Sequence, residues 1–155
     1  MDKEQLLKDI TRAFEGKIGE LRKAVATTQE MTRDAPGRIE SRYDTSREET
    51  GWVATGQAAL LGEWEHNYLQ FRSLAADLKD RVQPGAFFEA ESLDGAFSLK
   101  FLVCPGGSGL ECDTAYGTVT LLSPASPLAA AALGCRVNEV FNVNGRVDYR
   151  VREVA

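Results

Sequence analysis

The chain has 155 residues and a formal net charge of −5, and 43% of its residues are hydrophobic. That fraction is ordinary for a folded protein and excludes a chain that is disordered throughout. The acidic balance, without any cluster of Lys and Arg, argues against direct binding to duplex DNA, because phosphate contacts need concentrated positive charge. It fits a protein that meets a basic protein surface or a metal ion. The length allows one ordinary domain or two small ones.

Membrane spans and secretion signals are not evident in the sequence. The longest apolar run, around Ala125–Leu133, is far shorter than the roughly 20 residues that cross a bilayer. The first residues form no apolar signal-peptide core, so we expect a cytoplasmic protein without membrane contact. The cysteines are Cys104, Cys112 and Cys135. In the cytoplasm, reduced thiols are a better interpretation than a disulfide between Cys104 and Cys112.

The first part of the chain predicts two long helices. Apolar residues recur at steps of three and four from Leu7 to Val25, which places one apolar stripe on a helix. The stretch 34–37, Asp-Ala-Pro-Gly, ends it, because proline lacks an N–H and glycine frees the backbone. A second helical stretch is expected from about Arg38 to Val82. The two stripes are Leu7, Ile10, Phe14, Ile18, Leu21 and Val25, and then Trp52, Ala59, Leu60, Trp64, Tyr68, Phe71, Leu74 and Leu78.

Two amphipathic helices joined by a short turn are expected to fold back as an antiparallel hairpin. Residues near the turn include few large apolar side chains, so the tip, about 31–40, should project into solvent. Trp64, Tyr68 and Phe71 should pack at the base of the hairpin, opposite Phe14 and Ile10.

After about residue 82 the composition changes, and nearly all glycines and prolines follow. We therefore divide the chain into a coiled-coil hairpin domain, 1–82, and a C-terminal domain, 83–155. The second domain reads as strands with alternating apolar residues, including hairpins at Asp94-Gly95 and Asn144-Gly145. A glycine-rich loop at 106–109 is interpreted as a hairpin loop, and a short helix is expected at about Pro127–Leu133. The predicted fold class is α+β.

Two stretches carry a resemblance to a known family. The first is Arg42-Tyr43-Asp44-Thr45-Ser46-Arg47-Glu48-Glu49-Thr50-Gly51-Trp52. The second, within Val119–Ala155, contains Ser123-Pro124-Ala125-Ser126-Pro127-Leu128, then Leu133-Gly134, Asn144-Gly145 and Tyr149-Arg150-Val151. In order and spacing these resemble the Gre factors, which bind in the secondary channel of bacterial RNA polymerase. The resemblance implies a long helical coiled-coil hairpin followed by a β-rich domain like that of FK506-binding proteins.

The tip determines what a Gre factor can do. In members that stimulate transcript cleavage, an acidic pair at the tip helps to hold a catalytic Mg²⁺ in the polymerase active site, so the factor alone has no catalytic residues. Carboxylates are suitable ligands for Mg²⁺. Here the two acidic positions of the family fall on Pro36 and Ile39. The remaining candidate metal ligands are Asp34, Glu40 and Asp44, and the alternative is that these acids only solvate an exposed hairpin.

The polymerase-binding residues implied by the resemblance are Tyr43 and Arg47 on the second helix and a loop comprising Ala125, Ser126, Pro127 and Leu128. In the family an acidic residue commonly precedes Ser-Pro, and here that residue is Ala125. The same segment also has a purely structural interpretation, with Ser126 as N-cap and Pro127 in the first helical position.

We therefore expect a factor that binds bacterial RNA polymerase, modulates elongation and stimulates cleavage weakly or not at all. It would be no enzyme by itself, would bind no cofactor alone, would share Mg²⁺ only with the polymerase, and would meet nascent RNA indirectly. One alternative is a true cleavage factor whose tip carboxylates reach the catalytic magnesium. Others are a coiled-coil scaffold and a chaperone of the FK506-binding-protein type. The cysteine spacing and the lone His66 do not indicate zinc.

Overall fold

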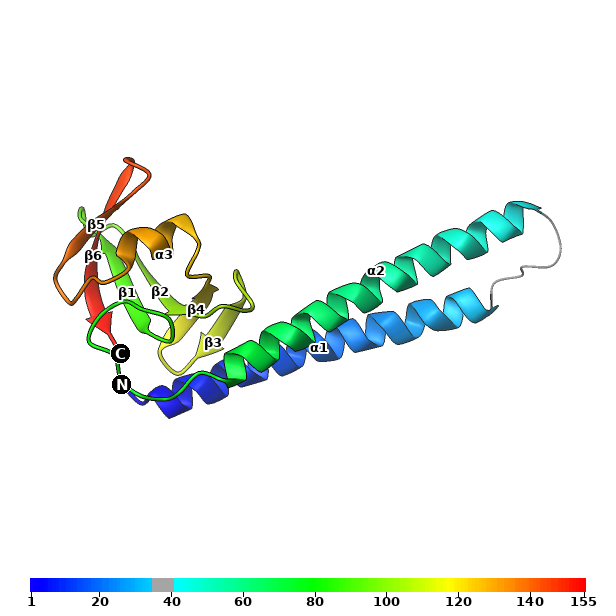
Figure 1. Ribbon diagram of the computed structural model, residues 1–155, viewed down its shortest axis with the longest axis horizontal. Coiled ribbons are helices and arrows are strands. Elements are labelled where there is room, and N and C mark those ends of the chain that lie inside the picture. Colours follow the sequence, from blue (N-terminus) through cyan, green and yellow to red (C-terminus); the bar gives the residue numbers. More distant parts are fainter. Residues whose placement is uncertain (35–40) are drawn as a thin grey trace. The chain divides into compact units, whose positions relative to one another are not determined.

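The computed structural model describes the backbone of residues 1–34 and 41–155 and the side chains of residues 1–31 and 55–155. Two long helices come first, α1 (Lys3–Asp34) and α2 (Ser41–Arg72), and strands with one short helix follow (Figure 1). The later elements are β1 (Phe87–Ser92), β2 (Ser98–Val103), β3 (Glu111–Thr114), β4 (Gly117–Leu122), α3 (Pro127–Ala132), β5 (Val140–Val143) and β6 (Val147–Val154). The predicted α+β class, with helices before strands, is confirmed.

The described residues form two compact units. One, here called the sheet unit, comprises Met1–Ala13 and Asn67–Ala155, and the other, the helical unit, comprises Phe14–His66. This division differs from the predicted boundary between residues 82 and 83. The reason is visible at Val82, which is buried in the core of the sheet unit. Its N–H donates to the carbonyl of Cys135, and its carbonyl accepts from the N–H of Gly134, both at 2.8 Å.

The second helix ends earlier than its sequence pattern predicts. Helix α2 stops at Arg72, ten residues before the expected end at Val82. The hydroxyl of Ser73 donates to the carbonyl of Gln70 at 2.6 Å, and the backbone N–H groups of Ser73 and Leu74 bond three residues back, not four. A side-chain donor that satisfies a terminal carbonyl favours the end of a helix. The chain then leaves the helix, and Leu78, predicted to lie on the stripe, is 65% exposed.

The sheet of the sheet unit has six strands in the order β3-β4-β2-β1-β6-β5. Neighbouring strands are antiparallel except β2 and β4, which are parallel, with Phe101 paired with Thr120. The two predicted turns are present, since Gly95, Asn144 and Gly145 all have positive φ, as tight turns between antiparallel strands require.

The glycine-rich loop after β2 is not a hairpin loop, which corrects the sequence interpretation. Strand β4 lies between β2 and β3, so β3 pairs only with β4. The expected positive φ is nevertheless found at Gly107 and Gly109. The loop therefore carries the chain past one strand position, and β3, which the sequence did not predict, lies at the edge of the sheet.

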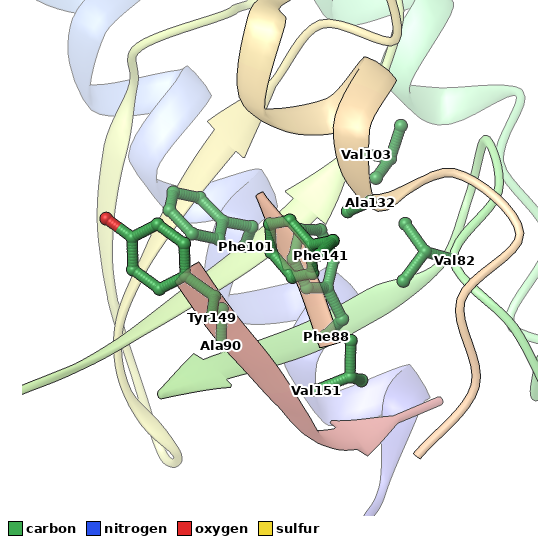
Figure 2. Packing of buried hydrophobic residues seen from close by; sticks show 9 residues of the cluster. All are labelled: Val82, Phe88, Ala90, Phe101, Val103, Ala132, Phe141, Tyr149 and Val151. Atoms are coloured by element: carbon green, nitrogen blue, oxygen red, sulfur yellow. The ribbon is translucent and has the colours of Figure 1, made fainter. Parts of the chain in front are cut away.

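The core of the sheet unit lies between α3 and one face of the sheet. Figure 2 shows its nine buried residues, with Phe88 and Phe101 in ring contact at 5.3 Å and Phe141 stacked on Tyr149 at 5.5 Å. The cluster comprises Val82, Phe88, Ala90, Phe101, Val103, Ala132, Phe141, Tyr149 and Val151. Alternation along β1, β2 and β6 places the cluster residues of these strands on one face of the sheet.

Most of the predicted stripe of α1 is buried. Of its members, Ile10 is buried in the sheet unit, and Phe14, Ile18 and Val25 in the helical unit. Leu7 and Leu21 are half-buried, and Leu6, which was not placed on the stripe, is buried beside Leu7. In the helical unit the ring of Phe14 meets that of Trp64 edge-on at 6.0 Å, as the sequence predicted for the base. The apolar stripe predicted for α2 is buried at some positions and exposed at others.

Two of its predicted members, Ala59 and Leu60, are exposed. Phe71, in the sheet unit, is buried as expected.

Candidate functional site

Among the residues predicted to bind the polymerase, those between β4 and α3 have side chains that the structure describes. Ser126 has φ −65° and ψ 149°, and its hydroxyl oxygen accepts a hydrogen bond from the N–H of Ala129 at 3.2 Å. Pro127 follows at the start of the helix. This is the N-cap arrangement predicted from the sequence, in which a side chain satisfies a free N–H of the first turn. The cap fixes the direction in which α3 leaves the loop.

Further hydrogen bonds hold this loop in shape. The N–H of Ser126 donates to the carbonyl of Ser123 at 3.0 Å, and the N–H of Ala125 donates to the Ser123 hydroxyl at 3.2 Å. The N–H of Ser123 in turn donates to the hydroxyl of Ser108 in the glycine-rich loop at 3.4 Å. On the other side, α3 is anchored by the buried Ala129 and Ala132. The loop is thus a constrained connection between strand and helix.

The exposed residues of this loop are small and uncharged. Ala125 and Pro127 are exposed, while Leu128 is half-buried and packs against the core cluster. None of the side chains from Ala125 to Leu128 titrates, so this segment can contact a partner but cannot transfer a proton or hold a cation. A rigid, uncharged loop of this kind is suited to recognition by shape.

The other predicted site residues lie in or beside the gap in the description. Asp34 is the last residue of α1, and Tyr43, Asp44 and Arg47 belong to α2. Their side chains, and the whole of Glu40, Pro36 and Ile39, fall outside the described residues. The grouping of Asp34, Glu40 and Asp44 as metal ligands therefore stays a prediction.

In the helical unit, the two helices are joined by charged and aromatic contacts near residues 14–22. The guanidinium of Arg22 lies 3.7 Å from a carboxylate oxygen of Glu65, and the ammonium of Lys17 lies over the Trp64 ring at 5.6 Å. Such exposed pairs contribute little stability individually. Together with the contact between Phe14 and Trp64, they fix which residues of the helices are neighbours.

The sequence interpretation missed how the first turns of α1 are fastened inside the sheet unit. The carboxylate of Asp9 accepts hydrogen bonds from the N–H of Ala115, in the turn after β3, and from the side-chain amide of Gln5, both at 2.9 Å. The bond from Ala115, followed by that from Gln5, lowers the pKa of Asp9 below its ordinary value. Asp9 therefore stays charged and bonded at neutral pH.

Lys3 anchors the start of α1 at a second point in the sheet unit. Its side chain is buried, and the ammonium donates to the backbone carbonyls of Asp77 at 2.7 Å and Ala155 at 3.2 Å. Burial lowers the pKa of Lys3, while the nearby Asp77 carboxylate opposes this effect. A signal was present in the sequence, because Lys3 stands four residues before Leu7, the first residue of the predicted stripe, and so lies on the same side of the helix.

The thiols and the histidine do not form a reactive or metal-binding group. All three cysteines are free, as predicted. Burial raises the pKa of each thiol, that of Cys112 to about 12, so thiolate formation is disfavoured. His66 is exposed on α2. Within the residues that the structure describes, no group of His, Cys, Asp and Glu could hold a metal ion.

Within the same described ranges, none of the helices has the length and apolar character needed to cross a membrane.

Comparison with known proteins gives structural similarities only. No family model and no curated protein matches the chain. The solved structures that are similar include GreA factor homolog 1 (Gfh1) of Thermus thermophilus, at 17% identity and a TM-score of 0.39, covering 94% of each chain. Another structure of the transcription factor Gfh1 has 19% identity and a TM-score of 0.38, covering 95% of this chain and 94% of that one. Gfh1 of Thermus aquaticus has 17% identity and a TM-score of 0.37, with coverages of 91% and 90%.

Proposed function

We propose that this chain is an accessory factor of bacterial RNA polymerase, built on the plan of the Gre factors, that modulates elongation. The observation that carries the proposal is the constrained loop at Ala125–Leu128. Its sequence resembles the segment by which Gre factors are expected to dock, with Ala125 in place of the usual acidic residue, and its exposed residues stand on a hydrogen-bonded turn before α3. The side chains of this loop carry no titratable group, which fits a role in binding.

The helical part of the proposal rests on length and polarity. Helices α1 and α2 have 32 residues each, and an α-helix of that size is about 48 Å long. We propose that they form an antiparallel coiled-coil hairpin with a tip near residues 31–40, long enough to enter a channel of the polymerase. We further propose that the sheet unit is the equivalent of the domain that resembles FK506-binding proteins.

At the tip, the proposed chemistry belongs to the polymerase. A second Mg²⁺ in its active site would need carboxylate oxygens from the factor, since Mg²⁺ prefers hard oxygen ligands. The two positions that the family uses carry Pro36 and Ile39, neither of which offers such an oxygen. Asp34, Glu40 and Asp44 remain as candidate ligands. We therefore propose a factor that occupies the channel, with Tyr43 and Arg47 contacting the polymerase, and stimulates cleavage weakly or not at all.

The docking loop supplies a direct test. Ala125 is exposed and stands where the family commonly has an acidic residue before Ser-Pro, so Ala125→Asp should add an attractive charge toward a basic partner surface. We expect it to tighten binding to purified bacterial RNA polymerase about three- to tenfold, as measured by fluorescence anisotropy of labelled protein. The gain should shrink at high salt, because exposed charges are screened.

A matched control separates this effect from a change in overall charge. Ala130→Asp introduces the same charge at an exposed alanine in α3 and should leave the affinity nearly unchanged. Equal gains for the two variants would show that the loop has no special role. If the unmodified chain fails to bind the polymerase at micromolar concentrations, the proposed function is wrong.

A further inference from the structure

One face of the sheet is covered only in part by α3. The core cluster beneath α3 includes the later residues of β2, Phe101 and Val103, both of which are buried. The starting residues of the same strand, Ser98 and Leu99, are exposed, and so are the starting residues of β4, Gly117 and Thr118. Because β2 and β4 are parallel, their uncovered first residues lie at the same end of the sheet.

Apolar side chains gather on this uncovered region. Phe97 is 47% exposed, Leu99 40% and Val147 38%. Val147 stands two residues before Tyr149 on β6, so the two side chains lie on the same face of the sheet. The rings of Phe97 and Tyr149 meet edge-on at 6.0 Å. Clustered exposed apolar residues cost free energy in water and often mark binding surfaces.

The apolar region continues into a polar depression across the neighbouring strands. Leu99 lines this depression together with Ser98, Lys100, Glu111, Thr118 and Thr120, from β2, β3 and β4. Thr118 donates to the carboxylate of Asp113 at 3.4 Å. The region thus has an apolar end, near Phe97, and a hydroxyl-lined end bordered by the acidic edge strand β3.

The charges around this region are mainly negative. The carboxylates are those of Asp94, Glu111 and Asp113, against the cations Lys100 and Arg146. Of these two cations, Lys100 is engaged, because its ammonium donates to the carbonyl of Tyr116. A second copy of the same surface would present like charges, which disfavours self-association through it. The complementary partner is therefore one that combines apolar and basic residues.

We propose that this surface, which we call the open face (Phe97, Leu99 and Val147, bordered by Glu111 and Asp113), binds a basic amphipathic segment of a partner protein. The apolar side chains of that segment cover Phe97 and Leu99, and its Lys or Arg side chains pair with Glu111 and Asp113. The open face is separate from the docking loop, since it lies at the starting ends of β2 and β4, whereas Ser126 follows the last residue of β4. Binding of a partner segment to the open face does not require the proposed contact between the docking loop and the polymerase.

The test uses the full chain and a defined probe. A synthetic amphipathic helix of about 18 residues, with leucines at i, i+3, i+4 and i+7 and lysines on the remaining positions, is titrated against the labelled protein. We expect a Kd on the order of 10 µM. Phe97→Ser and the pair Glu111→Lys with Asp113→Lys should each weaken binding about tenfold. The charge pair lies on an edge strand at exposed positions, so it tests the surface even if Phe97→Ser fails to fold.

Two controls decide the outcome. Leu133→Ser removes a similarly exposed apolar side chain, 43% exposed, outside the open face and should leave the affinity unchanged. A peptide with glutamates in place of the lysines should not bind. The proposal is overturned if the basic peptide does not bind, if Leu133→Ser has the same effect as Phe97→Ser, or if the acidic peptide binds equally well. A dimer in sedimentation that Phe97→Ser abolishes would also overturn it, because the occupant would then be a second copy.

Discussion

At the scale of single residues, Gly106 is held by a close approach between a loop and a helix. A Cβ atom at this position would lie 2.8 Å from the Cα and carbonyl oxygen of Asn67 and from the amide oxygen of Gln70. The two backbone atoms cannot move away as a flexible side chain could. The loop after β2 therefore packs against the end of α2 only because residue 106 lacks a side chain.

We predict that Gly106→Ala destabilises the protein by about 1–3 kcal/mol, the usual cost of forcing extra atoms into a packed site. Gly19→Ala is the control, because nothing lies within 4 Å of the Cβ it would add. On a helix that change should stabilise by about 0.5–1 kcal/mol. Urea unfolding of both variants checks the pair, and equal stability of Gly106→Ala and the unmodified protein would refute the close approach.

Asp9 gives a prediction that depends on pH. Its pKa is lowered in the folded protein, first by the hydrogen bond from Ala115 and then by that from Gln5. The charged carboxylate thus stabilises the fold above its ordinary pKa of 3.8, and this contribution is lost as the pH falls through the folded value. Asp9→Asn should lower Tm at pH 7, and the difference from the unmodified protein should shrink below about pH 4.

The control for Asp9→Asn is Glu4→Gln, on an exposed residue of the same helix, for which the same melting curves should coincide at both pH values. A constant difference in Tm for Asp9→Asn across the whole range would mean that the carboxylate charge is not what the contact with Ala115 requires.

At the scale of elements, α3 is short and depends on its cap. It has six residues, and Ser126 satisfies the N–H of Ala129. Ser126→Ala should cost about 0.5–2 kcal/mol, whereas Ser126→Asn, also a good N-cap residue, should keep most of the stability. Thermal melts of the two variants check this. If Ser126→Asn is as unstable as Ser126→Ala, the cap is not what holds this turn.

The local signals in the sequence predicted most of these elements. Asp94-Gly95 and Asn144-Gly145 gave correct turns because tolerance of positive φ is a property of the turn residues themselves. Ser126-Pro127 gave the start of α3 because an N-cap serine followed by proline is also a local signal. Strand β3 was missed because its four residues are stabilised by pairing with β4, not by their own pattern. Long-range pairing of this kind leaves little trace in a short sequence window.

The end of α2 shows the opposite error. Leu74 and Leu78 continue a helical spacing, yet the helix stops at Arg72 because residues beyond it satisfy partners elsewhere. The carbonyl of Asp77 accepts from Lys3, and Val82 bonds to residues 134 and 135. Tertiary contacts override a periodic pattern when they use the same backbone groups. The turn before α3, with Ser126 as N-cap, was found where expected, but the hydrogen bonds of this loop to Ser123 and Ser108 could not be predicted from spacing.

At the scale of the whole molecule, the first helix belongs to both compact units. Residues Met1–Ala13 are part of the sheet unit, and Phe14 onward of the helical unit. The sequence predicted one boundary, near residue 82, because composition changes there. The composition of a segment indicates whether it prefers helix or strand, but it does not indicate in which of the two units its side chains are buried. That is why the fastening of Lys3 and Asp9 inside the sheet unit was not foreseen.

The proposed function is also a property of the whole molecule, since it requires a loop that docks and a tip that reaches the polymerase active site. In the proposed function, binding to the polymerase and metal chemistry depend on different segments of the chain. The loop at Ala125–Leu128 would provide affinity, while the tip, with Pro36 and Ile39 at the family's acidic positions, would not supply the carboxylates that a second Mg²⁺ needs.

The measurement that tests this most directly is a paired assay on a backtracked elongation complex of purified bacterial RNA polymerase, with Mg²⁺ present. Binding of the protein and cleavage of the transcript are scored in the same samples. We predict binding without appreciable stimulation of cleavage, and no change in cleavage for Asp34→Ala combined with Glu40→Ala. Strong cleavage that this double variant abolishes would contradict it, because the tip would then present carboxylates to the catalytic metal.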